Sequence, residues 1–255
     1  MAVPTTPASI HARFHKLSLV VLALIACQVL LGSTVRATGS GMGCPDWPLC
    51  HGSFLPAMNF ESILEYSHRL VAALVTLSLT LVGGWVVASA PLRAYVGRLV
   101  GVTGALIVTL IVFGAVTVAY DMPPVIVATH LELAALLLLT WVTMSLRARA
   151  QAVGAGEEPA RGAYRVALVV AFGAAFVQLF LGAMVSVSHA GVACPDFPTC
   201  YGMYLPPLVG NVGVQMTHRF GAYTVATLIA VALVLVELQA GARVRRWMRL
   251  AAMLV

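Results

Sequence analysis

Six long apolar runs constrain what this chain can fold into more than any other feature of its sequence. A helix needs about 20 apolar residues to cross the hydrocarbon core of a bilayer. Runs of about that length cover residues 17–35, 63–89, 99–119, 125–146, 165–187 and 213–238, and a seventh run starts near Trp247. The sequence therefore predicts an all-α membrane protein that crosses the bilayer at least six times.

The composition excludes the main alternatives. Hydrophobic residues make up 60% of the 255 residues and charged residues only 9%, whereas a soluble domain of this size has about a quarter charged residues. Too few polar side chains remain to cover a water-exposed globule, which argues against soluble, disordered and small disulfide-rich classes. The net charge is +6, but no basic patch alternates with exposed aromatic residues, so nucleic-acid binding is not predicted.

The placement of the basic residues predicts an orientation, because cytoplasmic loops of membrane proteins carry an excess of Lys and Arg. Of the 15 basic residues, 12 lie in one set of loops. They are Arg13, Lys16, Arg93, Arg98, Arg147, Arg149, Arg161, Arg165, Arg243, Arg245, Arg246 and Arg249. We therefore expect a cytoplasmic N-terminus, with loops 36–62 and 188–212 facing outward. The excess of Arg over Lys suggests a bacterial cell membrane, and no cleavable signal peptide is predicted.

The two halves of the chain match each other without gaps at an offset of 150 residues. Cys44-Pro45-Asp46 recurs as Cys194-Pro195-Asp196, and the same offset relates further Gln, Gly, Pro, Cys and His-Arg positions. The only polar, Gly/Ala-rich linker inside the chain covers residues 150–163, which predicts domains at 1–149 and 164–255. Since the first half has four spans, the second half is expected to start in the same orientation, and it is incomplete in this chain.

Polar residues inside membrane spans are costly and are candidates for function. Glu65 and His68 are three positions apart and therefore share one helix face. His68 and His130 each lie about six residues inside the outer end of their runs, which places them at one depth. Two neutral imidazoles at one depth, on neighbouring helices, are suited to axial ligation of a haem iron, and His218 repeats His68. A single such histidine is as often a hydrogen-bonded packing residue.

Two further features accompany these histidines. Arg69 and Arg219 could each anchor a carboxylate such as a haem propionate, or could extend to the lipid headgroups, and the sequence leaves both roles open. Glu65 corresponds to Gln215, which cannot ionise. A carboxyl one turn from an iron ligand could act as a base or stabilise a developing cation, so we expect the chemistry in the first half.

Cysteine pairs occur in both outward loops, as CPDWPLC over 44–50 and CPDFPTC over 194–200. A zinc site would need two more ligands, and the c-type haem signature is absent. On the oxidising side of a membrane we expect Cys44–Cys50 and Cys194–Cys200 disulfides, either redox-active or structural.

The remaining candidates are interpreted as structural. Cys27 is expected to be a buried small hydrophobe. His51 and His189 are interpreted as loop residues, although a role in a proton path is open. His11 and His15 are expected to be solvated in a basic tail.

The combination of EYSHR at 65–69, THLE at 129–132, MTHR at 216–219 and the two cysteine loops resembles the haem A synthase family. The resemblance implies two tandem four-helix transmembrane bundles. It further implies that the first bundle oxidises the C8 methyl group of haem O to a formyl group, giving haem A for terminal oxidases. The second bundle would hold haem b.

Carried onto this chain, the resemblance implies that Glu65, His68 and His130 form the catalytic site and that His218 is one haem b ligand. The partner of His218 would fall near residue 280, which this chain does not contain. The expected partners are the haem O substrate, the lipid bilayer, a haem O synthase and an electron acceptor. Two rival functions are a di-haem b cytochrome that exchanges electrons with quinone, and a transporter with duplicated halves.

Overall fold

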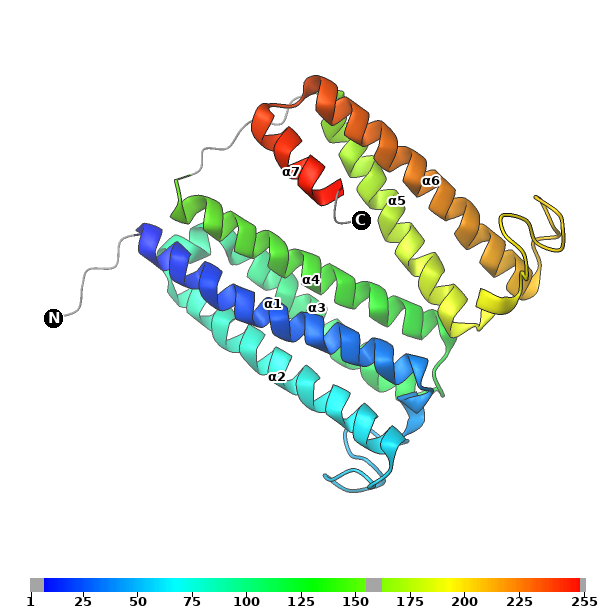
Figure 1. Cartoon of the computed structure of the whole chain (residues 1–255). Coiled ribbons are helices and arrows are strands. Elements are labelled where there is room, and N and C mark those ends of the chain that lie inside the picture. Colours follow the sequence, from blue (N-terminus) through cyan, green and yellow to red (C-terminus); the bar gives the residue numbers. More distant parts are fainter. Residues whose placement is uncertain (1–6, 155–161, 253–255) are drawn as a thin grey trace. The chain divides into compact units, whose positions relative to one another are not determined.

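The computed structural model describes residues 7–154 and 162–252, and these residues form helices and short loops with no extended strand (Figure 1). Six helices are long and apolar enough to cross a membrane. They are α1 (Pro7–Ala37), α2 (Phe60–Ala88), α3 (Ala90–Ala119), α4 (Pro124–Ala152), α5 (Ala163–Val187) and α6 (Gly210–Gln239). The prediction of an all-α, multi-pass membrane protein is confirmed.

The chain divides into two compact units, Met1–Gly156 and Glu157–Val255. α4 continues to Ala152, inside the segment that the sequence predicts as a linker, and α5 begins at Ala163. Of the linker predicted at residues 150–163, residues 155–161 lie outside the described residues.

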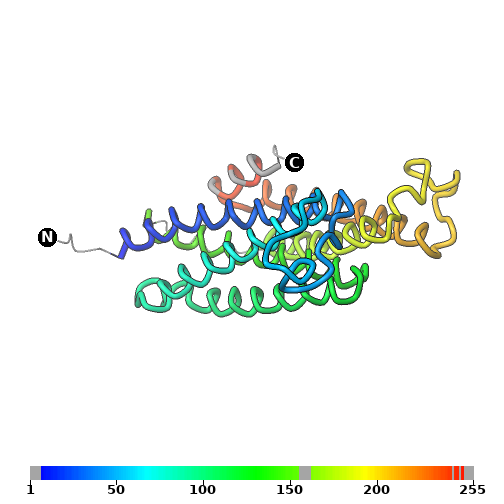
Figure 2. The backbone as a smooth tube through the Cα atoms, turned by 90° about the horizontal axis from the view of Figure 1, so that it is seen from below, coloured from blue at the N-terminus to red at the C-terminus, as the bar shows by residue number. Residues whose placement is uncertain are grey.

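The first unit is a four-helix bundle in which each helix packs against the next, and α4 packs against α1 (Figures 1 and 2). Short connections make consecutive helices antiparallel: Ser89 alone joins α2 to α3, and residues 120–123 join α3 to α4. α2 and α4 therefore run in the same direction at diagonally opposite corners. Many side chains on the outer faces of these helices are apolar and exposed, as expected for a surface that faces lipid.

An aromatic core closes the end of the bundle away from the cysteine loop. The fully buried Phe14 ring lies 6.2 Å from the rings of both Trp85 and Trp141. Polar side chains beside it are paired across α1 and α4: Ser18 donates to Ser145 Oγ over 2.8 Å, and Trp141 donates to the Ser18 carbonyl oxygen over 3.1 Å. Buried polar groups in a membrane helix need such partners because lipid offers none.

The expectation that His11 and His15 are solvated is wrong. α1 begins at Pro7, ten residues before the apolar run, so both histidines lie within the bundle. His11 is buried with its ring edge against Tyr95, and His15 Nδ1 lies 3.0 Å from Ser145 Oγ. A hydropathy argument stops at the first polar residues, whereas the helix continues because their side chains find partners.

The second unit contains the antiparallel pair α5 and α6, followed by the amphipathic helix α7 (Ala242–Ala252). The Arg249 guanidinium pairs with the Glu237 carboxylate at 2.5 Å and connects α7 to α6. The seventh apolar run was predicted to start near Trp247, and this position lies within α7. Residues 253–255 lie outside the described residues.

The offset of 150 residues is reproduced in local structure. α1 and α5 end at equivalent positions, α2 and α6 begin at equivalent positions, and each connection contains a short 3-10 helix at the same place, Ser40–Met42 and Ala190–Val192. Cys50 pairs with Ser53, and Cys200 with Met203, through matching backbone hydrogen bonds. The tandem arrangement of two four-helix bundles stays a prediction.

Candidate functional site

His68 lies on α2 in close contact with α1. The amide nitrogen of Gln28 lies 3.0 Å from His68 Nδ1 and 3.2 Å from His68 Nε2. Gly32, one turn further along α1, leaves room for the ring, because a Cβ atom there would lie 2.9 Å from His68 Cε1. α1 therefore provides both a polar contact and a steric gap for this imidazole.

His130 lies on α4, in the first turns after the α3–α4 connection. Its Nδ1 atom is buried and has no hydrogen-bond partner. Gly114 of α3 is close to the ring, since a Cβ atom at that position would lie 3.6 Å from His130 Cε1. An unpartnered polar atom in a membrane bundle is costly, which makes His130 a candidate for function.

The two histidines come from diagonally opposite helices, and the expectation of neighbouring helices is wrong. His68 follows the first residue of α2 by eight positions, and His130 follows the first residue of α4 by six. This difference is about 3 Å along a helix axis, so the depths are similar. Because α2 and α4 lie across the bundle from each other, the two rings could hold a flat group from opposite sides.

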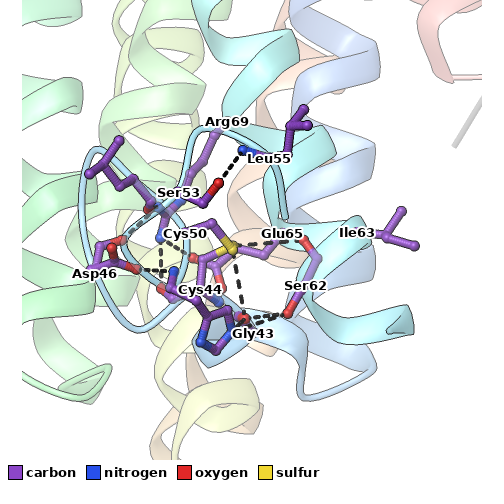
Figure 3. The surroundings of a disulfide bond; sticks show 12 residues. Gly43, Cys44, Asp46, Cys50, Ser53, Leu55, Ser62, Ile63, Glu65 and Arg69 are labelled. Carbon is purple, nitrogen blue, oxygen red and sulfur yellow. Dashed lines mark hydrogen bonds and ion pairs between the residues drawn. A yellow bond between two sulfur atoms is a disulfide. The ribbon is translucent and has the colours of Figure 1, made fainter. Parts of the chain in front are cut away.

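Glu65 connects the site to the cysteine loop (Figure 3). Its carboxylate is buried, and one oxygen accepts a hydrogen bond from the Cys44 backbone N–H over 2.8 Å. The other oxygen pairs with the Arg69 guanidinium at 2.5 Å. Glu65 thus has a fixed orientation and a compensated charge, one helical turn from His68.

Arg69 also holds the backbone of the loop. Besides Glu65, it donates to the carbonyl oxygens of Cys44, Asp46 and Leu49 over 2.7–2.8 Å. These four bonds use the N–H groups of both terminal nitrogens. A bidentate contact with a haem propionate would therefore have to replace bonds that hold the loop. Neither interpretation of the sequence included this role of Arg69 in fixing the loop backbone.

Arg219 has the same role in the second unit. It donates to the carbonyl oxygens of Asp196 and Thr199 over 2.7 Å and of Cys194 over 3.3 Å, and its guanidinium lies 5.5 Å from the centre of the Phe197 ring. The counterpart of Glu65, Gln215, has a buried Oε1 atom without a hydrogen-bond partner. The loop therefore keeps its arginine contacts where the carboxylate is missing.

Both cysteine pairs form disulfides, Cys44–Cys50 and Cys194–Cys200, as predicted. Each loop also contains an aspartate that accepts two backbone hydrogen bonds. Asp46 accepts from the N–H groups of His51 and Gly52 over 2.6 and 2.7 Å. The hydrogen bond from Gly52 contributes most, and together these bonds lower the pKa of Asp46 below its ordinary value.

Asp196 repeats this arrangement in the second loop. It accepts from the Thr199 hydroxyl and from the N–H groups of Gly202 and Tyr201. The Thr199 hydrogen bond is the largest cause of the lowered pKa of Asp196. Both aspartates are thus held as anions that fix a tight turn.

His218 in the second unit has a glutamine and a glycine beside it, as His68 does. Gln178 Nε2 lies 2.9 Å from His218 Nδ1 and donates to the main-chain oxygen of His218 over 2.8 Å. A Cβ atom at Gly182 would lie 3.0 Å from His218 Cε1.

Sequence reasoning missed the two glutamines as site residues. The signal was present, because in each half a glutamine precedes the histidine by 40 residues and a glycine precedes it by 36. Cys27 was expected to be buried, and this expectation is wrong: the thiol is exposed on the outer face of α1. His51 is a loop residue, as interpreted, with Nε2 3.0 Å from the Gly43 carbonyl oxygen.

The donor set of the first unit fits a haem better than a bare metal ion. Among the described residues, no group of three or more His, Cys, Asp or Glu side chains could hold an ion. A haem brings four ligands of its own and needs only axial groups from the protein. His68 and His130, with glycines beside both rings, could supply such axial groups.

These observations define a class: an all-helical, multi-pass membrane protein with a disulfide loop at the end of a histidine-bearing bundle, whose loop and first helix pair occur twice. Comparison with known families gives the particular one. A model described as cytochrome oxidase assembly protein (COX15-CtaA) matches residues 15–64 and 57–255. The chain belongs to this cytochrome oxidase assembly protein family.

Similar proteins with curated names are called Heme A synthase. The protein of Symbiobacterium thermophilum is 33% identical over 220 residues, which covers 83% of this chain and 72% of that protein. The protein of Halalkalibacterium halodurans is 32% identical over 215 residues, covering 81% and 70%. A Bacillus cereus protein is 30% identical over 236 residues, covering 88% and 73%.

Proposed function

We propose that this protein is a haem A synthase, an oxidoreductase that converts the C8 methyl group of haem O to the formyl group of haem A. The observation that carries the proposal is the pair His68 and His130 on diagonally opposite helices of the first unit. The membership of the family and the similarity to proteins named Heme A synthase support the same function.

His68 and His130 are proposed to hold the haem substrate between α2 and α4. Each ring has a glycine of an adjacent helix beside it, Gly32 and Gly114 respectively, so the backbone approaches closely. Both rings need a neutral nitrogen lone pair to bind iron, which the apolar interior favours because it disfavours the charged imidazolium. Binding from two sides would fix the position of the substrate relative to Glu65.

Glu65 is proposed to provide the negative charge or proton acceptor for the oxidation. Its carboxylate is already fixed by Cys44 N–H and Arg69, so it does not have to reorganise during the reaction. A carboxylate can accept more than two hydrogen bonds, which leaves capacity on both oxygens. Arg69 then orients Glu65 and the loop and is not proposed as a ligand of the substrate.

The second unit is proposed to hold a haem b with His218 as one axial ligand. Such a haem supplies one-electron transfer when bound. Gln215 in place of Glu65 supports a site without its own substrate oxidation. Arg219 is engaged with loop carbonyls, so contact with a propionate would have to use its remaining N–H groups.

The proposed environment is a bacterial cell membrane, with the N-terminus in the cytoplasm and both cysteine loops outside. A haem O synthase would supply the substrate, and an electron acceptor in or near the membrane would take the electrons. The support for this orientation is the concentration of basic residues in one set of loops.

Extraction of the haems from purified protein tests the function. Chromatography of wild-type protein is expected to yield haem O or haem A in addition to haem b. A yield of haem b alone would favour a di-haem b cytochrome, and the absence of a Soret band would favour the transporter.

Replacement of the proposed ligands tests the site. His68→Ala and His130→Ala are each expected to abolish haem A formation in protein that still inserts into the membrane. His15→Ala is the matched control, because it removes a histidine from the other end of the same bundle, and it should retain haem A. A near-normal haem A yield from either ligand variant would contradict the assignment.

A further inference from the structure

Arg36, in the last turn of α1, faces the interior of the first unit. It follows the buried Ser18 by 18 residues and the buried Ile25 by 11, which correspond to about five and about three full turns of a helix. The three residues therefore share the face of α1 that packs inside the bundle. The Nε atom of Arg36 is buried, so this side chain does not extend to the lipid headgroups as a snorkelling arginine would.

The helix register also places Arg36 close to the proposed haem site. Gly32, which leaves room for the His68 ring, precedes Arg36 by one turn on the same helix. At a rise of about 1.5 Å per residue, Arg36 lies about 6 Å nearer the end that carries the cysteine loop. α1 packs against both α2 and α4, the helices of His68 and His130. An inward-facing arginine thus lies one turn beyond the level of the two imidazoles.

The charges at this end of the first unit leave Arg36 as the main cation for an anionic ligand. Arg36 and Arg69 are the only two Lys or Arg residues that the first half has at this end. Arg69 is engaged with the Glu65 carboxylate and with three loop carbonyl oxygens, so its charge is already compensated. Asp46 and Glu61 add further negative charge there. A ligand that brings carboxylates into this region therefore requires Arg36.

A haem has this chemistry, because it is a flat apolar group with two ionised propionates on one edge. Within a bundle, such carboxylates are costly unless they lie close to water or to a cation. A guanidinium is a planar fork with five N–H donors, so it can form two parallel bonds to a carboxylate and keep other contacts as well. We propose that Arg36 binds a propionate of the haem substrate and turns that edge of the haem towards the cysteine loop.

The second half lacks this arginine. At the offset of 150 residues Arg36 corresponds to Ser186, which is exposed and carries no charge. Glu65 likewise corresponds to Gln215, so both charged groups that distinguish the first site lie in the half proposed to oxidise its haem. A residue that sets the direction of a bound substrate is needed only there, and the inference rests on that proposed function.

Titration with haem O and with its dimethyl ester separates a propionate contact from other roles of Arg36. The protein is purified from cells that lack haem O synthase, so that no haem O is present before the titration, and the Soret band reports binding. We expect Arg36→Gln to weaken the binding of haem O about tenfold to a hundredfold, as for the loss of hydrogen bonds to a charged group. Its affinity for the ester should equal that of the wild type.

Two further variants complete the test. Arg98→Gln is the matched control, because Arg98 is exposed on α3 at the other end of the same bundle, and it should bind both compounds like the wild type. Arg36→Lys keeps the positive charge that the C-terminal end of α1 favours, but it loses the planar fork. Its preference for haem O over the ester should therefore be smaller than that of the wild type.

Several outcomes would overturn the inference. Equal losses for haem O and the ester in Arg36→Gln, or no loss for either, would assign Arg36 to the end of α1 alone. The same selective loss in Arg98→Gln would show a general effect of charge. If Arg36→Gln does not insert, an unchanged preference in Arg36→Lys would overturn it. Wild-type protein that does not bind haem O would overturn the proposed function itself, and this result is distinct from the others.

Discussion

Glycines on the preceding helices make room for the histidine rings of this protein. His68 and His218 each face a glycine on the preceding helix, Gly32 and Gly182, where an added Cβ atom would crowd the ring. Neither glycine has a positive φ, so the requirement is space and not backbone conformation. The absence of a side chain is therefore as important for the site as the imidazole.

Gly32→Ala is expected to displace the His68 ring and to weaken haem retention about tenfold or more, because the added methyl group would lie 2.9 Å from Cε1. Gly84→Ala on α2 is the control, since a Cβ atom there meets nothing within 4 Å. That variant should be neutral or stabilise the helix by about 0.5–1 kcal/mol. Haem content and thermal unfolding of both variants check this expectation, which fails if the two behave alike.

Glu65→Gln is expected to retain haem and the loop but to lose most of the oxidation. The second half supports the first part, because a loop with Gln215 keeps its disulfide and its arginine contacts. The removal of a charged or proton-accepting group costs about tenfold to a thousandfold in rate. Chromatography should therefore find accumulated haem O or its alcohol.

Glu61→Gln is the control for this substitution, because Glu61 is an exposed carboxylate in the first turn of the same helix. It should form haem A at the normal rate. Normal haem A formation by Glu65→Gln would assign Glu65 to the loop alone.

At the scale of elements, the cysteine loops depend on polar contacts to their backbone more than on apolar packing. Arg69 bonds three carbonyl oxygens, Asp46 bonds two N–H groups, and Ser62 donates to the Gly43 carbonyl oxygen over 2.5 Å. A loop without a sheet must satisfy its backbone groups in this way. The disulfide then joins two ends that are already fixed.

The first loop is expected to loosen at acidic pH. Backbone hydrogen bonds lower the pKa of folded Asp46 below its ordinary value of 3.8. The stabilisation is therefore complete above that ordinary value and is lost as the pH falls through the lowered, folded pKa. Amide hydrogen exchange at Gly52 should lose protection over that range. Asp46→Asn should lower protection at neutral pH and remove its pH dependence, and protection that is constant down to the lowest pH would contradict this.

The sequence predicts the helices well and their packing poorly. Six apolar runs locate six helices, because lipid requires every backbone group of a span to bond within its own helix. The ends are less certain: α1 and α3 begin about ten residues before their runs, since polar residues such as His15 find partners in the bundle. The short turns at Ser89 and residues 120–123 place α2 and α4 at diagonally opposite corners of the bundle, and hydropathy alone does not reveal this arrangement.

The site was predictable only where a polar residue is costly. His68, His130 and Glu65 stand out because each is ionisable within a span. Gln28 does not stand out, since an uncharged amide within an apolar run resembles a packing residue. The role of Arg69 depends on three carbonyl oxygens that the loop brings together in space, and no linear spacing encodes that arrangement.

For the whole molecule, the distribution of basic residues predicts the orientation in the membrane. Alkaline phosphatase needs disulfides and is active only on the oxidising side of a membrane. A fusion after Asp121, in the turn between α3 and α4, should therefore be active. A fusion after Ser89, between α2 and α3, should be inactive, and the reverse pattern would contradict a cytoplasmic N-terminus.

The Glu65 carboxylate also makes the electrostatics of the two loops different. Both loops carry one aspartate and one arginine, Asp46 with Arg69 and Asp196 with Arg219, but the first half adds the buried Glu65 carboxylate. A buried negative charge is poorly screened and acts over several ångströms. The two loops have nearly the same backbone, but the first therefore has a more negative electrostatic potential than the second.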